Sequence, residues 1–215
     1  MPSIDFKIYL ITDRTQTLGR PLPQVIEEAG RAGIAAVQFR EKDLSLRDQL
    51  QLASEIRSAA RRYGMKFFVN DRVDLALALD AEGVHLPSSG LPIGVARDML
   101  GGARFVGVSC HSLEEVQRAE GEGADFALLG PVYDTPSKRS YGSPLGIGSF
   151  EKIRRSTAIP LFALGGINRS KLKEVFAAGA DGVALVSAIL SASDVDRECR
   201  MLLDAVGRLT PSPSG

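Results

Sequence analysis

The chain contains no tryptophan and only two histidines and two cysteines among its 215 residues. Cys110 and Cys199 lie far apart in the sequence and form no CxxC pair. A disulfide-rich framework or a zinc site would need more of these residues at closer spacing. This scarcity predicts a protein of a reducing compartment, the cytoplasm.

An excess of one charge is also missing, and so are long apolar runs. The 26 Lys and Arg residues balance the 26 Asp and Glu residues, whereas binding to nucleic acid or anionic membranes requires a basic excess or stripe. No apolar run approaches the roughly 18 residues of a membrane span, and the first residues lack the pattern of a signal peptide. We therefore expect neither nucleic acid nor membranes as partners. Any bound anion must be held by a local cluster of side chains.

What the sequence does contain is a regular alternation of apolar runs and helical patterns. The runs are rich in Val, Ile, Leu and Phe and lack polar alternation, which is typical of parallel strands buried on both faces. They occupy residues 7–12, 35–40, 66–70, 83–86, 105–109, 126–130, 160–165 and 182–186. Helical patterns such as 23–32, 45–62 and 112–121 separate them, and capping residues such as Ser112 and Asn168 open some of these segments.

Eight strand–helix repeats in this length predict a single-domain (β/α)8 TIM barrel of class α/β. We expect the barrel to span residues 1–209 and residues 210–215 to form a disordered tail. A doubly wound open sheet is the alternative. It would favour a glycine-rich GxGxxG turn after the first strand, where the chain instead reads Ile11-Thr-Asp-Arg-Thr.

Catalytic groups of such barrels collect where strands end, and the segment VQFREK is the clearest example here. In an extended chain Gln38, Arg40 and Lys42 share one side, while Phe39 and Glu41 face the other. The pattern predicts an amide and two cations at the barrel mouth. A rim of salt bridges is the alternative.

The next strand ends in Asn70 and Asp71. Asp71 could bind a hard cation such as Mg2+, or it could cap a helix that begins near Val73. With Arg40 and Lys42 on the adjoining strand, the metal–phosphate site is favoured.

Two later segments, ALGGIN and VSAI, favour a phosphate site. Gly165 and Gly166 expose backbone N–H groups after the seventh strand, and a helix begins near Ser187 after the eighth. These loops are the usual phosphate site of the barrel. The alternative is ordinary turn chemistry.

A long polar loop, residues 130–146, follows the sixth strand and carries Thr135, Ser137 and Lys138. Loops of this length in compact domains are usually lids, binding loops or disordered. We interpret it as a lid that carries Lys138 over the reacting groups.

Ser109 and the two histidines end strands or follow them. Ser109, at the end of the fifth strand, can donate a hydrogen bond to a ligand. His111 is expected beside the helix cap at Ser112. His85 is expected to lie tucked in at the end of its strand.

Taken in order, several segments resemble the thiamine phosphate synthase and thiazole tautomerase family over nearly the whole chain. They are YLITDR, VQFREK, FFVNDRVDLALAL, GVHL, VGVSCHSLEE, ADFALLGPVYDTPSK, ALGGI and GVALVSAI. The resemblance implies a TIM barrel and a Mg2+-dependent transferase of thiamine biosynthesis. That enzyme joins an aminopyrimidine methyl diphosphate to a thiazole ethyl phosphate and releases diphosphate. Small phosphorylated molecules are the implied partners, and a homo-oligomer is left open.

The resemblance also implies roles for individual residues. Gln38 would hold the pyrimidine, and Asp71 would bind Mg2+. Ser109 would lie beside the reacting methylene or the leaving group. The leaving diphosphate would be bound by Arg40, Lys42, Asn70 and Lys138. The thiazole phosphate would be held by Thr135, Ser137, Gly166, Val186 and Ser187.

This chain departs from the family pattern after GVHL. Synthases usually continue with Gly-Gln-x-Asp, whose Asp is a second metal ligand, and that Asp aligns with Gly90. The stretch Pro87-Ser-Ser-Gly90 resembles the tautomerase branch. However, the acid–base histidine of that branch aligns with Pro131, and the branch tends to lose the acidic residue present here as Asp71. A synthase is therefore predicted, with a thiazole phosphate tautomerase or a non-catalytic binder of thiazole phosphate or thiamine phosphate as alternatives.

Overall fold

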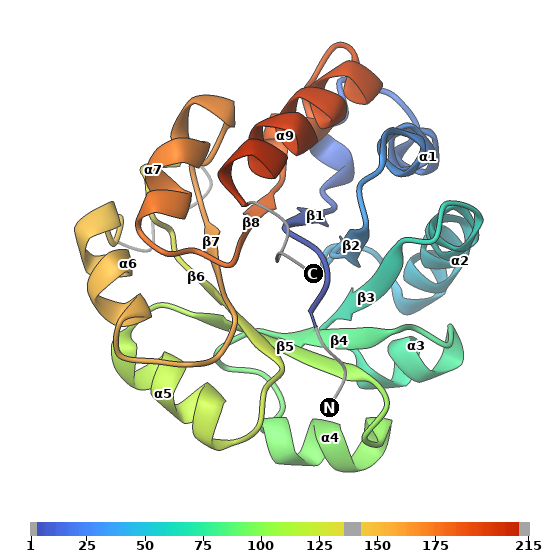
Figure 1. The fold of residues 1–215 in the computed structure, drawn as a ribbon. Coiled ribbons are helices and arrows are strands. Elements are labelled where there is room, and N and C mark those ends of the chain that lie inside the picture. Colours follow the sequence, from blue (N-terminus) through green and yellow to red (C-terminus); the bar gives the residue numbers. More distant parts are fainter. Residues whose placement is uncertain (1–3, 136–142, 211–215) are drawn as a thin grey trace, which may run out of the picture.

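In the computed structural model, which describes residues 4–135 and 143–210, eight parallel strands close into a barrel in chain order (Figure 1). The strands are β1 Ile8–Ile11, β2 Ala36–Phe39, β3 Lys66–Asn70, β4 Gly83–Leu86, β5 Phe105–Cys110, β6 Phe126–Leu129, β7 Leu161–Leu164 and β8 Gly182–Leu185. The predicted TIM barrel is confirmed, and every predicted strand is present. The predicted tail lies outside the described residues apart from Thr210.

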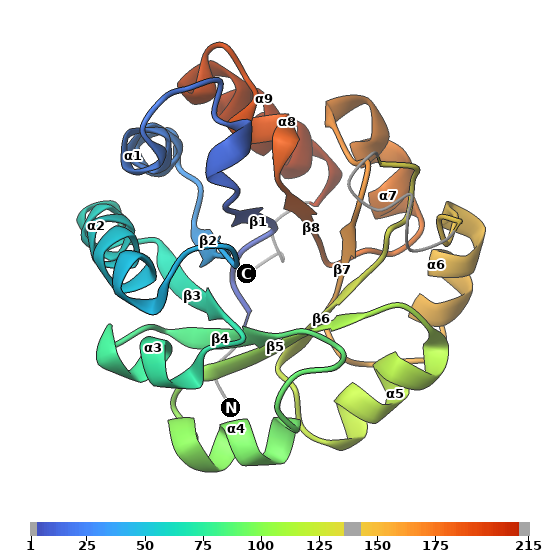
Figure 2. The same ribbon diagram turned by 180° about the vertical axis from the view of Figure 1, so that it is seen from behind.

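Helices form the outer ring around the strands (Figure 1). They are α1 Leu22–Ala32, α2 Leu46–Arg62, α3 Val73–Ala78, α4 Ile93–Leu100, α5 Leu113–Gly121, α6 Ile147–Arg154, α7 Leu172–Ala177, α8 Ser187–Leu190 and α9 Val195–Leu209, with 3-10 turns η1 Arg14–Gln16 and η3 Arg169–Lys171. Figure 2 shows α8 beside the segment that follows β1. The Arg20 guanidinium joins them by donating to the Leu190 carbonyl at 2.8 Å. No helix of the described chain is long and apolar enough to cross a membrane.

Alternate residues along each strand face two different cores. In β1, Ile8 and Leu10 pack against the helices, while Tyr9 and Ile11 fill the barrel. The interior is packed mainly with aromatic rings: Phe6, Tyr9, Phe68, Phe105, Phe126 and Phe162. Because both faces of every strand are buried, the strand sequences show no polar alternation.

Glycines make room for these rings. A Cβ added at Gly107 would lie 2.4 Å from Cζ of Phe126, and one at Gly182 would lie 2.3 Å from Cε1 of Phe162. Large rings on one strand therefore occupy the space left by glycines on the next, which fills the barrel as a solid core.

Carboxylates at the start of alternate strands fix the end of the barrel opposite the predicted site. Glu82, Asp125 and Asp181 accept hydrogen bonds from the N–H groups of Phe67, Val106 and Leu161 at 2.7, 2.7 and 2.8 Å. Each carboxylate also pairs with an arginine, as Asp125 does with Arg97 at 2.5 Å. The Asp125 side chain is only 2% exposed. This end therefore contributes to stability, which leaves the other end for chemistry.

Candidate active site

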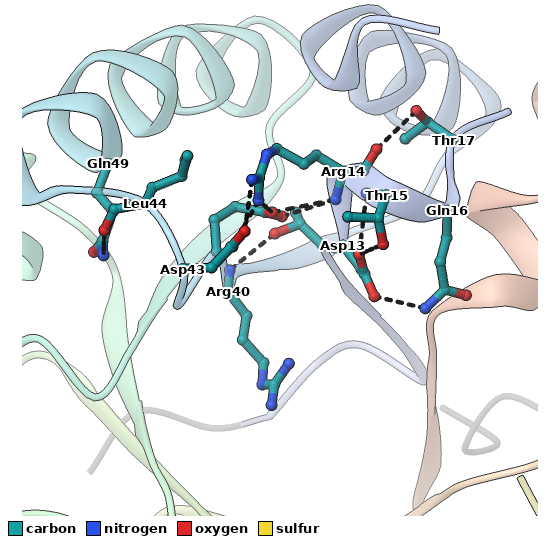
Figure 3. A network of polar contacts seen from close by, with 11 residues as sticks. Asp13, Arg14, Thr15, Gln16, Thr17, Arg40, Asp43, Leu44 and Gln49 are labelled. Carbon is teal, nitrogen blue, oxygen red and sulfur yellow. Dashed lines mark hydrogen bonds and ion pairs between the residues drawn. The ribbon is translucent and has the colours of Figure 1, made fainter. Parts of the chain in front are cut away.

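Backbone hydrogen bonds fix where Arg40 leaves the barrel. The N–H of Thr12 donates to the Gln38 carbonyl at 2.9 Å, and the N–H of Arg40 donates to Thr12 Oγ1 at 2.8 Å. Thr12 is fully buried, so these bonds lie in a protected environment. In Figure 3 the Arg40 side chain points away from Asp43 and Arg14.

Arg14 engages the acidic residues that flank Arg40 and Lys42 in sequence. Its guanidinium donates to Glu41 Oε2 at 3.1 Å and to both Asp43 oxygens at 2.7 and 2.6 Å (Figure 3). Its backbone N–H lies 3.2 Å from both Glu41 oxygens. The hydrogen bonds from Arg14 lower the pKa of Asp43 to about 2.

The loop after β1 supplies a third carboxylate that already accepts hydrogen bonds within the protein, Asp13. It accepts from the N–H of Thr15 at 3.1 Å and from the Gln16 amide at 2.6 Å. Burial raises the pKa of Asp13, but these hydrogen bonds and the nearby charge of Arg40 outweigh it, and the pKa lies below its ordinary value. Within the described residues no ion pair joins Arg40 or Lys42 to a carboxylate. This counts against a salt-bridged rim for these two cations, although Arg14, Glu41 and Asp43 form ion pairs beside them.

The loops after β2 and β3 enclose a hollow of about 320 Å³. Its lining consists of Phe39, Arg40, Glu41, Lys42, Gln49, Asn70, Asp71 and Arg72. Phe39 and Glu41, expected on the other side of the strand, therefore line the same hollow as the two cations. Partial burial, followed by the charge of Arg40, lowers the pKa of Lys42, while Asp71 opposes this shift. The structure thus brings together four predicted site residues from two strands. Such a site suits an anion that arrives with a cation.

Asp71 has an unusual backbone conformation, with φ of 65°. Its N–H continues the β3–β4 pairing by donating to the His85 carbonyl at 2.9 Å. Helix α3 has Arg72 at its N-cap and no side-chain capping bond, so the capping alternative for Asp71 is wrong. Arg72 itself pairs with Asp74. A left-handed non-glycine residue at a strand end is uncommon and is often associated with function.

Position 90 lies directly beside this carboxylate, although it belongs to the loop after β4. A Cβ added to Gly90 would lie 3.0 Å from Asp71 Oδ1 and 2.8 Å from Pro87 Cδ. The described positive-φ residues do not include Gly90, so its backbone conformation does not require glycine. No group of three or more His, Cys, Asp or Glu side chains in the described ranges could hold a metal. The single carboxylate of Asp71 is the kind of oxygen donor that Mg2+ uses together with waters and substrate oxygens.

Ser109 and Gln38 lie deeper, at the top of the aromatic core. Ser109 Oγ is 3.0 Å from His85 Nε2, and Gln38 donates to the Tyr9 hydroxyl at 3.3 Å. Gln38 and His85 are each 1% exposed, which agrees with the tucked-in position predicted for the histidine. Ser109 lines a second hollow, of about 200 Å³, which also includes Gly90. Gly90 thus lines the second hollow and lies beside Asp71, which lines the first.

The predicted phosphate loops lie after β7 and β8. Gly165 and Gly166 have φ of 98° and 66°, and a Cβ at Gly166 would lie 2.7 Å from the Asp134 carbonyl oxygen. The Tyr133 N–H donates to the Gly165 carbonyl at 3.1 Å, which joins this turn to the loop after β6. Turn geometry and close packing thus account for both glycines, and a phosphate role stays a prediction.

The remaining predicted residues have different outcomes. Val186 is the N-cap of α8 and Ser187 its first residue, while Thr135 is half-buried in the loop after β6. Ser137 and Lys138 lie outside the described residues, and so does most of the predicted lid. His111 flanks the helix cap as predicted, because its N–H donates to Glu115 Oε2 at 2.6 Å.

Comparison with known proteins agrees with this architecture. Residues 8–189 match the family described as thiamine monophosphate synthase. A relative from Geobacter sulfurreducens is 49% identical over 203 residues, or 94% of this chain and 95% of its own. A thiamine-phosphate synthase of Chloroflexus aurantiacus is 41% identical over 93% of this chain and 92% of its own.

A solved structure extends the likeness to three dimensions. Thiamine phosphate pyrophosphorylase from Pyrococcus furiosus superposes with a TM-score of 0.86 at 37% identity, covering 95% of this chain and 96% of that one. Both the identity and the coverage are high enough to establish kinship rather than a shared barrel alone. The chain belongs to the thiamine monophosphate synthase family.

Proposed function

We propose that the protein is a thiamine phosphate synthase that couples an aminopyrimidine methyl diphosphate to a thiazole ethyl phosphate. The bond between the methylene carbon and the diphosphate oxygen breaks, and its electron pair leaves with diphosphate. The thiazole nitrogen then forms the new bond to the methylene carbon. Family membership and relatives named for this activity support the proposal.

The observation that carries the proposal is the hollow lined by Arg40, Lys42, Asn70 and Asp71. Arg14 engages the neighbouring acids Glu41 and Asp43, so both cations remain available to an anion. Cations fixed before the reaction stabilise a leaving diphosphate because they need no rearrangement as its charge develops. We assign these residues, with Lys138 as a further cation, to the diphosphate.

We assign Asp71 to Mg2+. When bound, the ion supplies charge neutralisation to the phosphoryl oxygens. Asp71 suits this role because its side chain forms no hydrogen bond or ion pair with any described residue. Mg2+ commonly binds through one or two carboxylates together with substrate phosphates.

The two organic groups are assigned to opposite sides of the mouth. Gln38 and Ser109, which lie deep in the barrel, suit the pyrimidine and its reacting methylene. We assign the thiazole phosphate to Thr135, Ser137, Gly166, Val186 and Ser187. Its binding can be tested by calorimetry with phosphorylated and dephosphorylated thiazole. Equal affinities would reject this phosphate site.

One observation favours a second function. Gly90 leaves Asp71 without a carboxylate neighbour, as expected for a thiazole phosphate tautomerase or a non-catalytic binder. Pro131 opposes the tautomerase, since proline cannot transfer the proton that the histidine of that branch transfers. The free, buried Cys110 and Cys199 support the predicted reducing compartment for any of these functions.

Assays of coupling and of thiazole isomerisation, each with and without Mg2+, test the proposal. We expect coupling that requires Mg2+ and no isomerisation. Arg40→Gln should reduce coupling by about two orders of magnitude, as does loss of one preorganised donor elsewhere. Arg208→Gln is the matched control, because this exposed arginine lies far along the chain on α9. Isomerisation without coupling would reject the synthase in favour of the tautomerase.

A further inference from the structure

His85 and Ser109 form a buried pair on neighbouring strands, β4 and β5. The ring Nε2 lies 3.0 Å from the hydroxyl oxygen, which is hydrogen-bond distance. The imidazole also packs against Tyr9 and Phe126, with ring centroids 5.8 and 5.6 Å away. Its exposure is only 1%. His85 therefore contacts Ser109 from below, and Ser109 separates it from the mouth.

The other ring nitrogen distinguishes the two tautomers. Nδ1 is buried and has no hydrogen-bond partner among the described residues. A Cβ added at Gly107 would lie 2.7 Å from Nδ1, so a hydrogen of that glycine points towards the ring nitrogen. A proton on Nδ1 would be a buried donor without an acceptor, which disfavours that tautomer. A lone pair there suits the facing C–H group better.

Protonation of both ring nitrogens would also place an N–H group at Nδ1, where no described residue accepts a hydrogen bond. With Nδ1 disfavoured as the proton's position, the proton lies on Nε2. The Nε2–H group then donates to Ser109 Oγ.

We infer that His85 is a positioning residue whose Nε2–H group holds Ser109 as a hydrogen-bond donor toward the bound pyrimidine diphosphate. The substrate half of this inference rests on the proposed function. By occupying one lone pair of the hydroxyl oxygen, His85 directs the O–H group away from itself. Ser109 alternates with Val108 and Cys110, which pack against the helices, so it faces the barrel interior near the carboxyl end of β5, and this direction leads to the mouth. The opposite tautomer would turn the O–H group toward His85 and present Ser109 to the ligand as an acceptor.

Nitrogen NMR of histidine-labelled protein tests the tautomer without any substrate. The chain has only two histidines, and the variant His111→Gln identifies the signals of His85. We expect Nε2 to show the shift of a protonated ring nitrogen and Nδ1 that of an unprotonated one at neutral pH. The reverse assignment, or a doubly protonated ring, would overturn the inference.

Two amide variants test the positioning role. In His85→Gln the amide reaches the place of Nε2, whereas in His85→Asn the shorter amide reaches only the place of Nδ1. We expect His85→Asn to lower kcat about tenfold, which corresponds to about 1.4 kcal/mol. This lies within the range of one lost hydrogen bond, and His85→Gln should recover most of the loss. Equal losses in both variants would contradict a role that depends on the Nε2 position. Circular dichroism establishes that both variants are folded.

A double-mutant cycle separates positioning from general support of the fold. We expect Ser109→Ala to lower kcat, and His85→Asn to cause no further loss in the Ser109→Ala background. The same tenfold loss in both backgrounds would show that His85 acts independently of Ser109. Normal kcat in Ser109→Ala would also overturn the inference. A folded wild-type protein that does not couple the substrates would instead refute the proposed function and the substrate half of this inference, with the NMR result unaffected.

Discussion

Replacing Arg14 with methionine removes the cation that engages Glu41 and Asp43. Glu41 is the critical partner, because its side chain is only 2% exposed, against 33% for Arg14. In Arg14→Met the buried Glu41 carboxylate keeps the backbone N–H of residue 14 but loses the guanidinium. Breaking a fully buried ion pair on one side costs about 3–5 kcal/mol. Because Arg14 is one-third exposed and the backbone donor remains, we expect a loss of about 2 kcal/mol of unfolding free energy.

Urea unfolding followed by far-UV circular dichroism measures this loss, since the chain has no tryptophan to report by fluorescence. The midpoint should fall while the m-value stays unchanged. The double variant Arg14→Met with Glu41→Gln should recover at least half of the loss, because no unpaired buried charge remains. Arg208→Met is the control on an exposed site and should change stability by no more than about 0.5 kcal/mol.

The same variant has a functional consequence. The freed Glu41 carboxylate becomes available to Arg40 and Lys42, so KM for the pyrimidine diphosphate should rise and the double variant should reverse the rise. A stability within about 0.5 kcal/mol of wild type would refute the importance of the buried pair. A KM that does not change would refute the idea that Arg14 keeps the two cations available.

Three further outcomes are expected. Asp125→Ala should lower the unfolding free energy by about 3 kcal/mol, because the buried Val106 N–H loses its carboxylate acceptor and Arg97 loses its ion pair. The exposed Asp204→Ala should have little effect, and equal midpoints in urea would contradict this. The pKa of His85 is lowered to about 3 in the folded protein, against an ordinary value near 6.5. Between these pH values the unfolded chain binds one more proton than the folded protein. This residue therefore makes the unfolding free energy fall by at most about 1.4 kcal/mol per pH unit as the pH is lowered through that range. His85→Gln should show a shallower slope in unfolding measured across the same pH range, and an unchanged slope would argue against a neutral buried ring. Gly90→Asp should lower the Mg2+ concentration for half-maximal coupling, because its side chain would begin beside Asp71, while the uncharged Gly90→Asn should not; equal behaviour of the two variants would exclude a metal-binding effect.

Local patterns predicted the barrel because each of them reports a property of a single segment. Strands buried on both faces carry apolar residues at most positions, and the capping serine Ser112 does accept from the Glu115 N–H. The order of the segments then fixes the architecture, since consecutive parallel strands joined by helices close in chain order. For the same reason, strand ends that carry polar residues converge on one face.

Contacts between loops could not be predicted in this way. Arg14 and Glu41 are 27 residues apart, and their pairing depends on how the loops after β1 and β2 fold onto each other. The sequence did contain a signal for this pairing, because an arginine follows the first strand and two acidic residues follow the second. The left-handed backbone of Asp71 and the contact of position 90 with its carboxylate likewise arise from the tertiary structure.

The central claim is that this protein joins a pyrimidine diphosphate to a thiazole phosphate, and phosphorus NMR of the purified protein with both substrates tests it most directly. With Mg2+ present, we predict that free diphosphate and thiamine phosphate form in equal amounts, and that both fall together in Arg40→Gln. Chelation of Mg2+ should stop both, and its readdition should restore them. If no diphosphate forms even at saturating Mg2+ while the folded protein still binds thiazole phosphate, the claim is contradicted.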